Sequence, residues 1–217
     1  LMNKNTLSLV ALGLAAGFAA FAGTASAADV TADSGLSPWM FRLRGIYVMP
    51  DEKAHLTVPG NVDVGDAIVA ELDISYFFTE NLAAELILGT TKHDVDGATG
   101  GLAGLNLGDV MLLPPTLTAQ YHFNVTDAIK PYIGAGVNYT IFYNENDGQF
   151  ASVDYKNAFG WALQAGVDIA AGDNWGVNLD VKKLFLDTKV SVNNGAVTSG
   201  KVELDPWIFG AGFYYRY

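Results

Sequence analysis

Residues 158–170 read AFGWALQAGVDIA, and this stretch decides the fold class. Bulky apolar side chains such as Phe159 and Leu163 alternate along it with glycine and with polar side chains such as Gln164 and Asp168. A period of two is typical of a β-strand whose two faces meet different surroundings. The sequence therefore predicts a strand of the kind that crosses a membrane as part of a β-barrel.

The same alternation runs through the rest of the chain in stretches of about ten residues. It predicts strands at residues 39–49, 67–78, 82–91, 114–123, 130–143 and 158–170, a seventh strand from residue 175, and an eighth from residue 207 to 217. In the seventh strand the alternation slips at Lys182 and Lys183. We interpret the slip as a bulge, or as the point where the strand leaves the membrane.

The predicted connections are short and long in strict alternation. Short turns fall at residues 79–81, 124–128 and 171–174, and long, polar, glycine-rich loops fall at about 50–66, 92–113, 144–157 and 187–202. Outer-membrane barrels have short turns on the periplasmic side and longer loops outside. The predicted fold is therefore all-β: an eight-stranded antiparallel up-and-down transmembrane β-barrel.

The small and polar face of each strand is expected to point into the barrel. In a soluble barrel with its apolar face inward, glycines such as Gly134 and Gly160 would lie on the outer surface and leave the backbone exposed. Inside a narrow barrel they leave room for neighbouring side chains. Buried charges need partners. The sequence predicts an ion network in the lumen, in which two arginines face the acids of the next strands: Arg42, Arg44, Glu71, Asp73 and Glu85.

Composition limits the function. The chain has 217 residues, with 12 Lys and Arg against 23 Asp and Glu and a formal net charge of −11. Nucleic-acid binding needs clustered basic residues, so this charge argues against a nucleic-acid partner. The sequence has no cysteine, which excludes disulfides and thiolate metal sites. After the N-terminal region no apolar run reaches about 18 residues, so a helical membrane protein is excluded.

The N-terminal region has the features of a secretory signal peptide. Lys4 precedes an apolar run over residues 7–22, and the ASA at residues 25–27 is a pattern that signal peptidase cleaves. A transmembrane anchor is the alternative, but the apolar run is short for a bilayer span. We therefore expect a signal peptide at residues 1–27 and one outer-membrane β-barrel domain at residues 28–217.

Three stretches are distinctive: LPPTLTAQ at 113–120, KPYIGAGVNYT at 130–140 and LDPW at 204–207. They resemble the OmpW family in both sequence and order, and the resemblance covers the chain beyond residue 27. It implies a barrel in the bacterial outer membrane, as a monomer surrounded by membrane lipid and lipopolysaccharide. It also implies passive uptake of small hydrophobic molecules, some of them alkanes, through a narrow apolar lumen and a lateral opening into the membrane.

The resemblance suggests which residues line the channel. Ile87 matches the aliphatic residue of the family's constriction, whereas Lys182 stands where the family has an aromatic residue. The expected channel lining is Val69, Ile87, Phe142, Lys182 and Ile208. The alternative for the apolar members, and for Phe77, is simple filling of the interior, which is normal in a small barrel.

Pro114 and Pro115 open the predicted fourth strand. Proline has no amide hydrogen, so it interrupts the hydrogen-bond ladder of a sheet. Such an interruption is what a lateral opening between strands needs. A plain transition from loop to strand would contain the same residues.

The sequence ends with alternating aromatic residues, Phe213, Tyr215 and Tyr217. This pattern resembles the C-terminal signal by which the barrel assembly machinery recognises its clients. We therefore expect that machinery to be a partner.

The sequence contains no catalytic motif: no nucleophile elbow, no phosphate loop and no zinc-binding spacing. His122 is expected inside the barrel as a hydrogen-bonding residue, and His55 and His93 in the long loops. Hydrolysis by Asp and His at the external rim is a less favoured alternative. We expect no enzyme activity, no cofactor and no metal site.

Two functions stay open on the sequence. One is the channel for hydrophobic solutes. The other is a non-conducting structural or receptor barrel whose external loops bind phage, bacteriocin or host surfaces. An interior dominated by the ion network favours the second function, and a continuous apolar stripe favours the first. The sequence contains residues for both.

Overall fold

The computed structural model describes residues 37–148, 150–193 and 198–217. The predicted signal peptide, residues 1–27, and the first residues of the predicted barrel domain lie outside the described residues. No helix in the described ranges is long and apolar enough to cross a membrane.

The described chain consists of β-strands and one short 3-10 helix. The strands are β1 (Trp39–Met49), β2 (Glu52–Leu56), β3 (Val62–Val64), β4 (Ala67–Phe77), β5 (Leu82–Gly89), β6 (Thr91–Gly97), β7 (Asn106–Leu113), β8 (Thr116–His122), β9 (Ile129–Asn146), β10 (Val153–Tyr155), β11 (Ala158–Ala170), β12 (Trp175–Val192), β13 (Thr198–Leu204) and β14 (Trp207–Arg216). The 3-10 helix, η1 (Gly100–Leu102), lies between β6 and β7.

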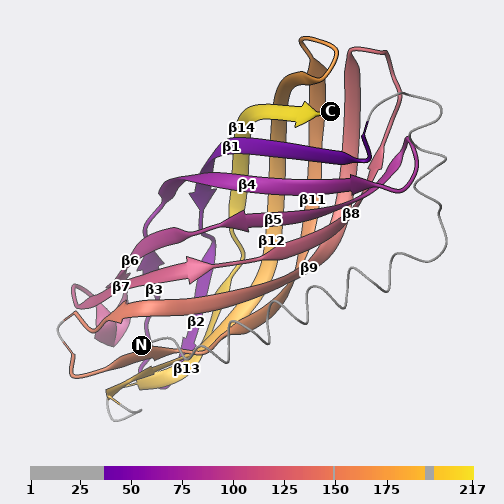
Figure 1. Ribbon diagram of the computed structural model, residues 1–217. Helices are drawn as coiled ribbons and strands as arrows, with labels where there is room; N and C mark the ends of the chain where they lie inside the picture. Colours follow the sequence, from indigo (N-terminus) through magenta and orange to yellow (C-terminus); the bar gives the residue numbers. More distant parts are fainter. Residues whose placement is uncertain (1–36, 149, 194–197) are drawn as a thin grey trace.

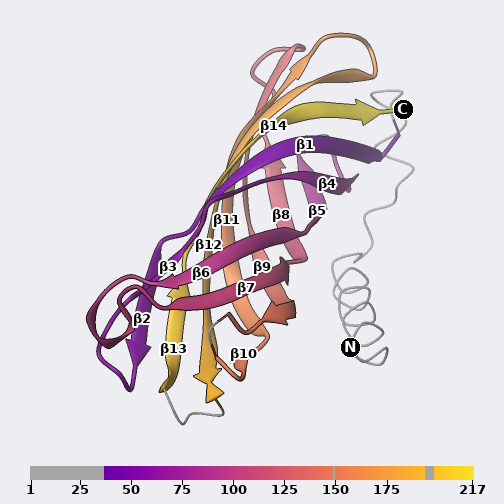
Figure 2. The same ribbon diagram turned by 90° about the vertical axis from the view of Figure 1, so that its left-hand side faces the viewer.

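Eight of these strands close into an antiparallel barrel, as the sequence predicted. Around the ring, each strand pairs with the next in the order β1, β4, β5, β8, β9, β11, β12 and β14, and β14 pairs again with β1. Figures 1 and 2 show the strands inclined around a common interior, with the C-terminus at the end of the short turns. Closure leaves no unpaired edge, which is the condition for a sheet to stand in hydrocarbon.

Alternation along each strand separates the outside from the inside. On β1, Phe41, Leu43 and Tyr47 are exposed, whereas Arg42 and Arg44 are fully buried. The apolar surface continues around the barrel as a belt of exposed large side chains, among them Ile68, Leu72, Ile133, Trp161, Leu163, Leu179, Phe209 and Phe213. Lipid is the environment in which such a belt is stable, so the predicted orientation of the two faces is confirmed.

The predicted long loops were largely wrong. Most of the four ranges form strands: β2, β3, β6, β7, β10 and β13, together with the far parts of β9 and β12, extend the barrel wall. The wall keeps its alternation here, but its outer face is polar. On β6, Lys92, Asp94 and Asp96 are exposed while His93 and Val95 are buried. Because the outer face of this wall contacts water, its strands have the polar composition expected of loops. The sequence therefore predicted loops in these ranges.

The predicted bulge at Lys182 and Lys183 was also wrong. β12 pairs without a register shift through both residues, with β11 on one side and β14 on the other. Inward positions continue regularly from Asp180 through Lys182 to Leu184 and Leu186. The inward face changes there from polar to apolar, and this change looked like a slip in the alternation.

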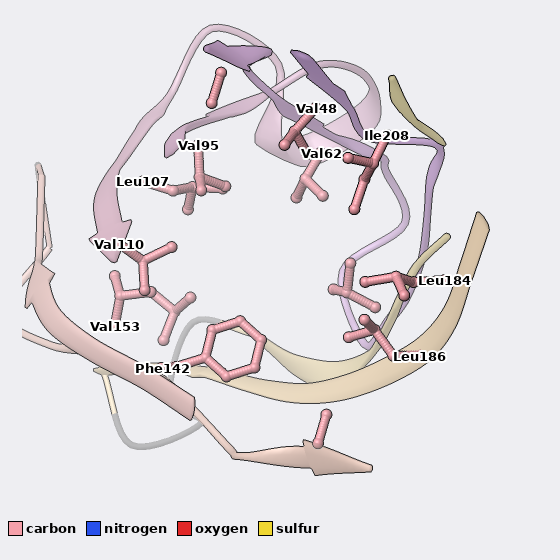
Figure 3. Packing of buried hydrophobic residues seen from close by; sticks show 14 of the residues in the cluster. Val48, Val62, Val95, Leu107, Val110, Phe142, Val153, Leu184, Leu186 and Ile208 are labelled. Atoms are coloured by element: carbon pink, nitrogen blue, oxygen red, sulfur yellow. The ribbon is translucent and has the colours of Figure 1, made fainter. Parts of the chain in front are cut away.

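Buried apolar side chains form two clusters inside the barrel. The larger fills the half that β2, β3, β6, β7 and β13 enclose, and Figure 3 shows Val48, Val110, Phe142, Leu184 and Ile208 directed toward its centre. The smaller, Met40, Phe77 and Ala83, lies at the end of the short turns. Polar and charged side chains fill the space between the clusters.

Candidate functional site

The interior of the barrel has two levels with opposite chemistry. On β1, which starts at the short-turn end, the inward residues are first Arg42 and Arg44 and then Ile46 and Val48. The charged level is here called the plug, and the apolar level above it the cavity. The plug contains Arg42, Arg44, Glu71, Asp73, Glu85, Asp168, Asp180 and Lys182.

Arg42 ties one side of the plug together. Its Nη1 lies 2.6 Å from Glu85 Oε1 and its Nη2 lies 2.7 Å from Asp168 Oδ2. Nη1 also donates a hydrogen bond of 2.7 Å to Ser75 Oγ. The register places Arg42 directly opposite Asp73, but its guanidinium reaches acids on β5 and β11 instead. Arg42 thus faces Asp73, as the sequence predicted, but forms its ion pairs with acids on other strands, because its side chain is long enough to cross the lumen.

Arg44 is surrounded by carboxylates. Its Nη2 lies 2.7 Å from Asp73 Oδ2 and 3.2 Å from Glu71 Oε1, and its Nη1 lies 3.3 Å from Asp180 Oδ2. Nη1 also donates to Asn178 Oδ1 at 3.0 Å. The predicted pairing of Arg44 with Glu71 and Asp73 is confirmed. Fully desolvated charges of this kind persist only when each has such a partner.

Lys182 closes the plug toward the cavity. Its Nζ donates to Glu71 Oε1 and lies 3.5 Å from Asp180 Oδ1. The side chain is almost fully buried, and both Lys182 and Glu71 contribute to the lining of the cavity above. The ion pair is therefore the floor of that cavity.

Amide and phenol side chains complete the plug. Gln120 Nε2 donates to Glu85 Oε2 at 2.6 Å, and Gln164 Nε2 donates to both Glu85 Oε2 and Asp180 Oδ2 at 2.9 Å. Tyr132 donates its hydroxyl to Asp180 Oδ2 at 2.7 Å. These neutral donors add hydrogen bonds to Glu85 Oε2 and Asp180 Oδ2, which Arg44 approaches only to 3.8 and 3.3 Å. Together with the ion pairs they form a hydrogen-bonded layer across the lumen.

His122 lies on the short-turn side of the plug, inside the barrel as predicted. Its ring stacks on Tyr132 with centroids 4.9 Å apart, and its Nε2 lies 3.1 Å from Gln120 Oε1. Phe77 packs against its other side, at 4.9 Å between ring centroids. These contacts place His122 in the packing around the plug.

The cavity above the plug is lined almost wholly by apolar side chains. Its empty space is about 740 Å³, including the open space at its mouth. Its apolar walls come from residues on both sides of the barrel: Ile46, Val48, Val64, Ile87, Leu112, Leu184, Leu186, Leu204 and Ile208. Further from the membrane, a second apolar hollow includes Phe142 and Val110. The external half of the barrel is thus an apolar container on a charged floor.

The cavity reaches a break in the barrel wall. Ladder pairing between β5 and β8 ends at Ile87 and Thr116, and pairing between β6 and β7 resumes at Thr91 and Leu112. No ladder pair joins the intervening residues, 88–90 and 113–115, all of which the structure describes. Residues on both sides of the break line the cavity: Ile87, Gly89, Thr91, Leu112, Pro114 and Thr116.

Pro114 and Pro115 explain why hydrogen bonding is interrupted toward β5 and β6 but is maintained toward β9. Neither residue has an amide hydrogen to donate toward β5 and β6. Their carbonyls are satisfied by β9, since Asn138 Nδ2 donates to Pro114 O at 3.1 Å and Tyr139 N donates to Pro115 O at 3.1 Å. The prolines lie between β7 and β8, so the fourth predicted strand begins at Thr116 and not at Pro114.

Four of the five expected lining residues lie in the two hollows. Ile87, Lys182 and Ile208 line the cavity, and Phe142 lines the second hollow. Val69 lines neither and packs, partly buried, against the apolar cluster. Leu184 and Leu186 were not predicted to line the cavity, because Lys182 and Lys183 were interpreted as a slip in the alternation. Their alternation with exposed Phe185 was the signal that could have revealed them.

The two remaining histidines lie on strands and not in loops, contrary to expectation. His93, on β6, lines the cavity and its Nδ1 lies 2.6 Å from Gly65 O. Burial lowers the pKa of His93 below its ordinary value, while the contact with Gly65 opposes the shift. His55, on β2, is exposed and lies 3.9 Å from Glu203. Within the described ranges no group of three or more His, Asp or Glu side chains is placed to hold a metal ion.

The C-terminal aromatic residues Phe213, Tyr215 and Tyr217 all face outward and are more than half exposed. They lie along and just beyond β14, the strand that closes the barrel against β1. The structure thus places the expected assembly signal on the lipid-facing surface.

Comparisons with known proteins agree with this architecture. Residues 35–217 match the model of the OmpW family. The crystal structure of the outer membrane protein OprG from Pseudomonas aeruginosa superposes with a TM-score of 0.75 at 28% identity, covering 82% of this chain and 95% of OprG.

Relatives in sequence include the following two proteins. An outer-membrane protein of Sinorhizobium fredii, y4mB, is 43% identical over 231 residues, covering 100% of each chain. The protein PahQ of Pseudomonas aeruginosa, named for a dibenzothiophene metabolism operon, is 34% identical over 180 residues, covering 78% of this chain and 84% of PahQ.

Proposed function

This chain belongs to the OmpW family and is a protein of the bacterial outer membrane, and from this premise we propose that it is a channel for the passive uptake of small hydrophobic molecules. In this proposal the molecule enters the cavity from outside, is stopped by the plug, and leaves sideways into the lipid through the break at Pro114 and Pro115. No catalytic chemistry takes part.

One observation carries the proposal. The apolar cavity is closed below by the plug and reaches the wall where the ladder is interrupted. A molecule in the cavity is therefore blocked along the barrel axis and is separated from lipid only by side chains at the break.

The chemistry of the walls selects the class of solute. Burial of apolar surface is favourable by roughly 25 cal/mol for each Å² removed from water, and the cavity offers almost no polar group to compete for a polar solute. Passage from the cavity into hydrocarbon leaves the solute in a similar environment, so no energy source is needed. The name of the relative PahQ points the same way, because dibenzothiophene is an apolar molecule.

Ile87 is the proposed constriction. It is 4% exposed, lies at the last pair before the break and lines the cavity. A larger side chain there would fill the route where the solute turns toward the lipid. Lys182 and Ile208 complete the proposed lining of the cavity, and Phe142 lines the second hollow.

The same plug supports a second candidate function, a non-conducting structural or receptor barrel. Arg42 and Arg44, both fully buried, close the axis as a structural core would. In that case the polar outer face of the extended wall would bind phage, bacteriocin or host surfaces. Uptake of a hydrophobic solute separates the two functions.

The proposed surroundings follow from the surface of the barrel. Membrane lipid and lipopolysaccharide would contact the exposed apolar belt. The barrel assembly machinery would recognise Phe213, Tyr215 and Tyr217. A monomer is proposed, because the ring of strands is already closed.

The experiment is uptake of radiolabelled decane by cells that lack their own hydrophobic channels and produce this barrel. Uptake above empty controls is expected, with a loss of about tenfold on Ile87→Trp, equivalent to roughly 1.4 kcal/mol on the barrier. Leu86→Trp is the matched control, since Leu86 is the outward neighbour on β5. Absence of uptake by a barrel that shows heat-modifiable gel mobility would overturn the channel.

A further inference from the structure

The floor of the cavity differs from its walls in being charged. Glu71 and Lys182 are the acidic and basic side chains of the lining, and both are nearly fully buried. A pure hydrocarbon in contact with this floor has no polar group that could form a hydrogen bond with it. The polar end of an amphiphilic solute would meet it directly, so the charge balance of the floor determines which polar ends are accepted.

Carboxylates outnumber cations in the plug below the floor. Three cations, Arg42, Arg44 and Lys182, are each within 4.0 Å of at least two carboxylates, and five carboxylates take part. Lys182 is shared between Glu71 and Asp180. No cation of the plug is left for an incoming anion, and the plug as a whole is negative.

Hydrogen-bond acceptors are also in excess. Oδ1 of Asp73 is buried without a hydrogen-bond partner, and Oδ1 of Asp180 has only the ion-pair contact of 3.5 Å with Lys182 Nζ. Glu71 receives its hydrogen bond at Oε1, from Lys182, and among the described residues no donor reaches its Oε2. Because Glu71 lines the cavity, this oxygen is the acceptor that the floor offers to a ligand.

The outer wall above the cavity is acidic as well. Exposed carboxylates surround the external half of the barrel, among them Asp51, Asp63, Asp94, Asp96 and Asp187. A field of one sign raises the local concentration of oppositely charged molecules and lowers that of like-charged ones. The wall and the floor therefore act in the same direction.

We propose that the cavity selects apolar solutes by the charge of their polar end, with Glu71 as the residue that determines this selectivity. It accepts uncharged molecules and amphiphiles that carry a protonated amine, and it rejects carboxylates with the same hydrocarbon chain. An ammonium group can donate to Glu71 Oε2, whereas a carboxylate meets a floor that is already acceptor-rich. The inference rests on the proposed channel function and deepens it by naming the solute class.

The test compares three solutes of equal chain length, decane, decylamine and decanoate, in the cell uptake assay at neutral pH. Decane and decylamine are expected to enter, and decanoate at least about tenfold more slowly than decylamine, since like-charge contacts are strongly unfavourable. Equal uptake of decanoate and decylamine, with decane entering, would overturn the selectivity and leave the channel intact. Failure of all three to enter would overturn the channel and the selectivity together.

Two further measurements locate the selectivity. Glu71→Gln should lower the decylamine-to-decanoate ratio, whereas Asp187→Asn, the same charge change on the exposed wall, should keep the wild-type ratio. In the wild type, the ratio should persist at high salt, because buried charges are screened much less than exposed ones. A ratio that collapses with salt, or that responds to Asp187→Asn as strongly as to Glu71→Gln, would assign the effect to the outer wall and overturn the role of Glu71.

Discussion

Lys182 and Leu184, consecutive residues on the inward face of β12, lie on opposite sides of the boundary between plug and cavity. Lys182 pairs with Glu71 and Asp180, whereas Leu184 packs in the apolar cluster and lines the cavity wall. The change from charge to hydrocarbon thus occurs within one inward step along a regular strand. That sharp boundary gives the apolar cavity a charged floor.

Restoring the ladder at the break should close the lateral route. Replacing Pro114 and Pro115 by Val and Thr supplies two amide hydrogens that can pair with residues 88–90. Decane uptake is expected to fall about tenfold, roughly 1.4 kcal/mol on the barrier, while the barrel stays folded. Unchanged uptake in a barrel with normal heat-modifiable mobility would show that solutes do not leave at this break.

Removing Arg42 should destabilise the barrel strongly. Arg42→Met leaves Glu85 and Asp168 buried without their cation, and breaking a buried pair in this way costs about 3–5 kcal/mol. Urea unfolding in detergent micelles measures the loss. Lys201→Met, which removes an exposed ion pair with Asp187, is the control and should not change the free energy of unfolding measurably.

Gly166 makes room for Tyr132 in the plug. A Cβ at this position would contact the Tyr132 hydroxyl and lie 2.7 Å from Leu179 O. Gly166→Ala should therefore displace Tyr132 from Asp180 and cost about 1–3 kcal/mol in the same unfolding assay. Gly45→Ala is the comparison, because a Cβ there meets nothing within 4 Å, and equal losses in the two variants would refute the explanation.

Acid should loosen the external wall around His93. Because burial lowers the pKa of His93 below 6.5, the folded wall favours the neutral ring. The stability that the neutral ring contributes is present above pH 6.5 and is lost as the pH falls through that value toward the lowered pKa. The protection of β3 and β6 amides against hydrogen exchange, corrected for the intrinsic exchange rate at each pH, should therefore fall on acidification.

His93→Gln separates this effect from general acid sensitivity. The glutamine amide can still donate to Gly65 O but does not titrate, so most of the loss of protection should disappear. His55→Gln is the matched control on the exposed face of β2 and should behave as the wild type. An equal acid response in His93→Gln would exclude His93 as its cause.

The sequence by itself determined the barrel and the orientation of its faces. The predicted bounds of the strands at 39–49 and 158–170 coincide with β1 and β11, because a period of two with glycine on one face and bulky apolar residues on the other has one stable arrangement in lipid. The pairing of Arg44 with Glu71 and Asp73 also followed, since these residues face each other on adjacent strands.

Only the tertiary structure decided how the interior is divided. Arg42 meets Asp168, 126 residues away, because barrel closure brings β1 and β11 to face each other across the lumen. In a barrel with tilted, staggered strands, the inward residues that share one level depend on the register of every pair around the ring. Alternation along one strand does not show which inward residues of different strands lie at the same height in the barrel. The sequence therefore identified the charged and the apolar inward residues but not their arrangement. Closure placed the first set below as the plug and the second above as the cavity.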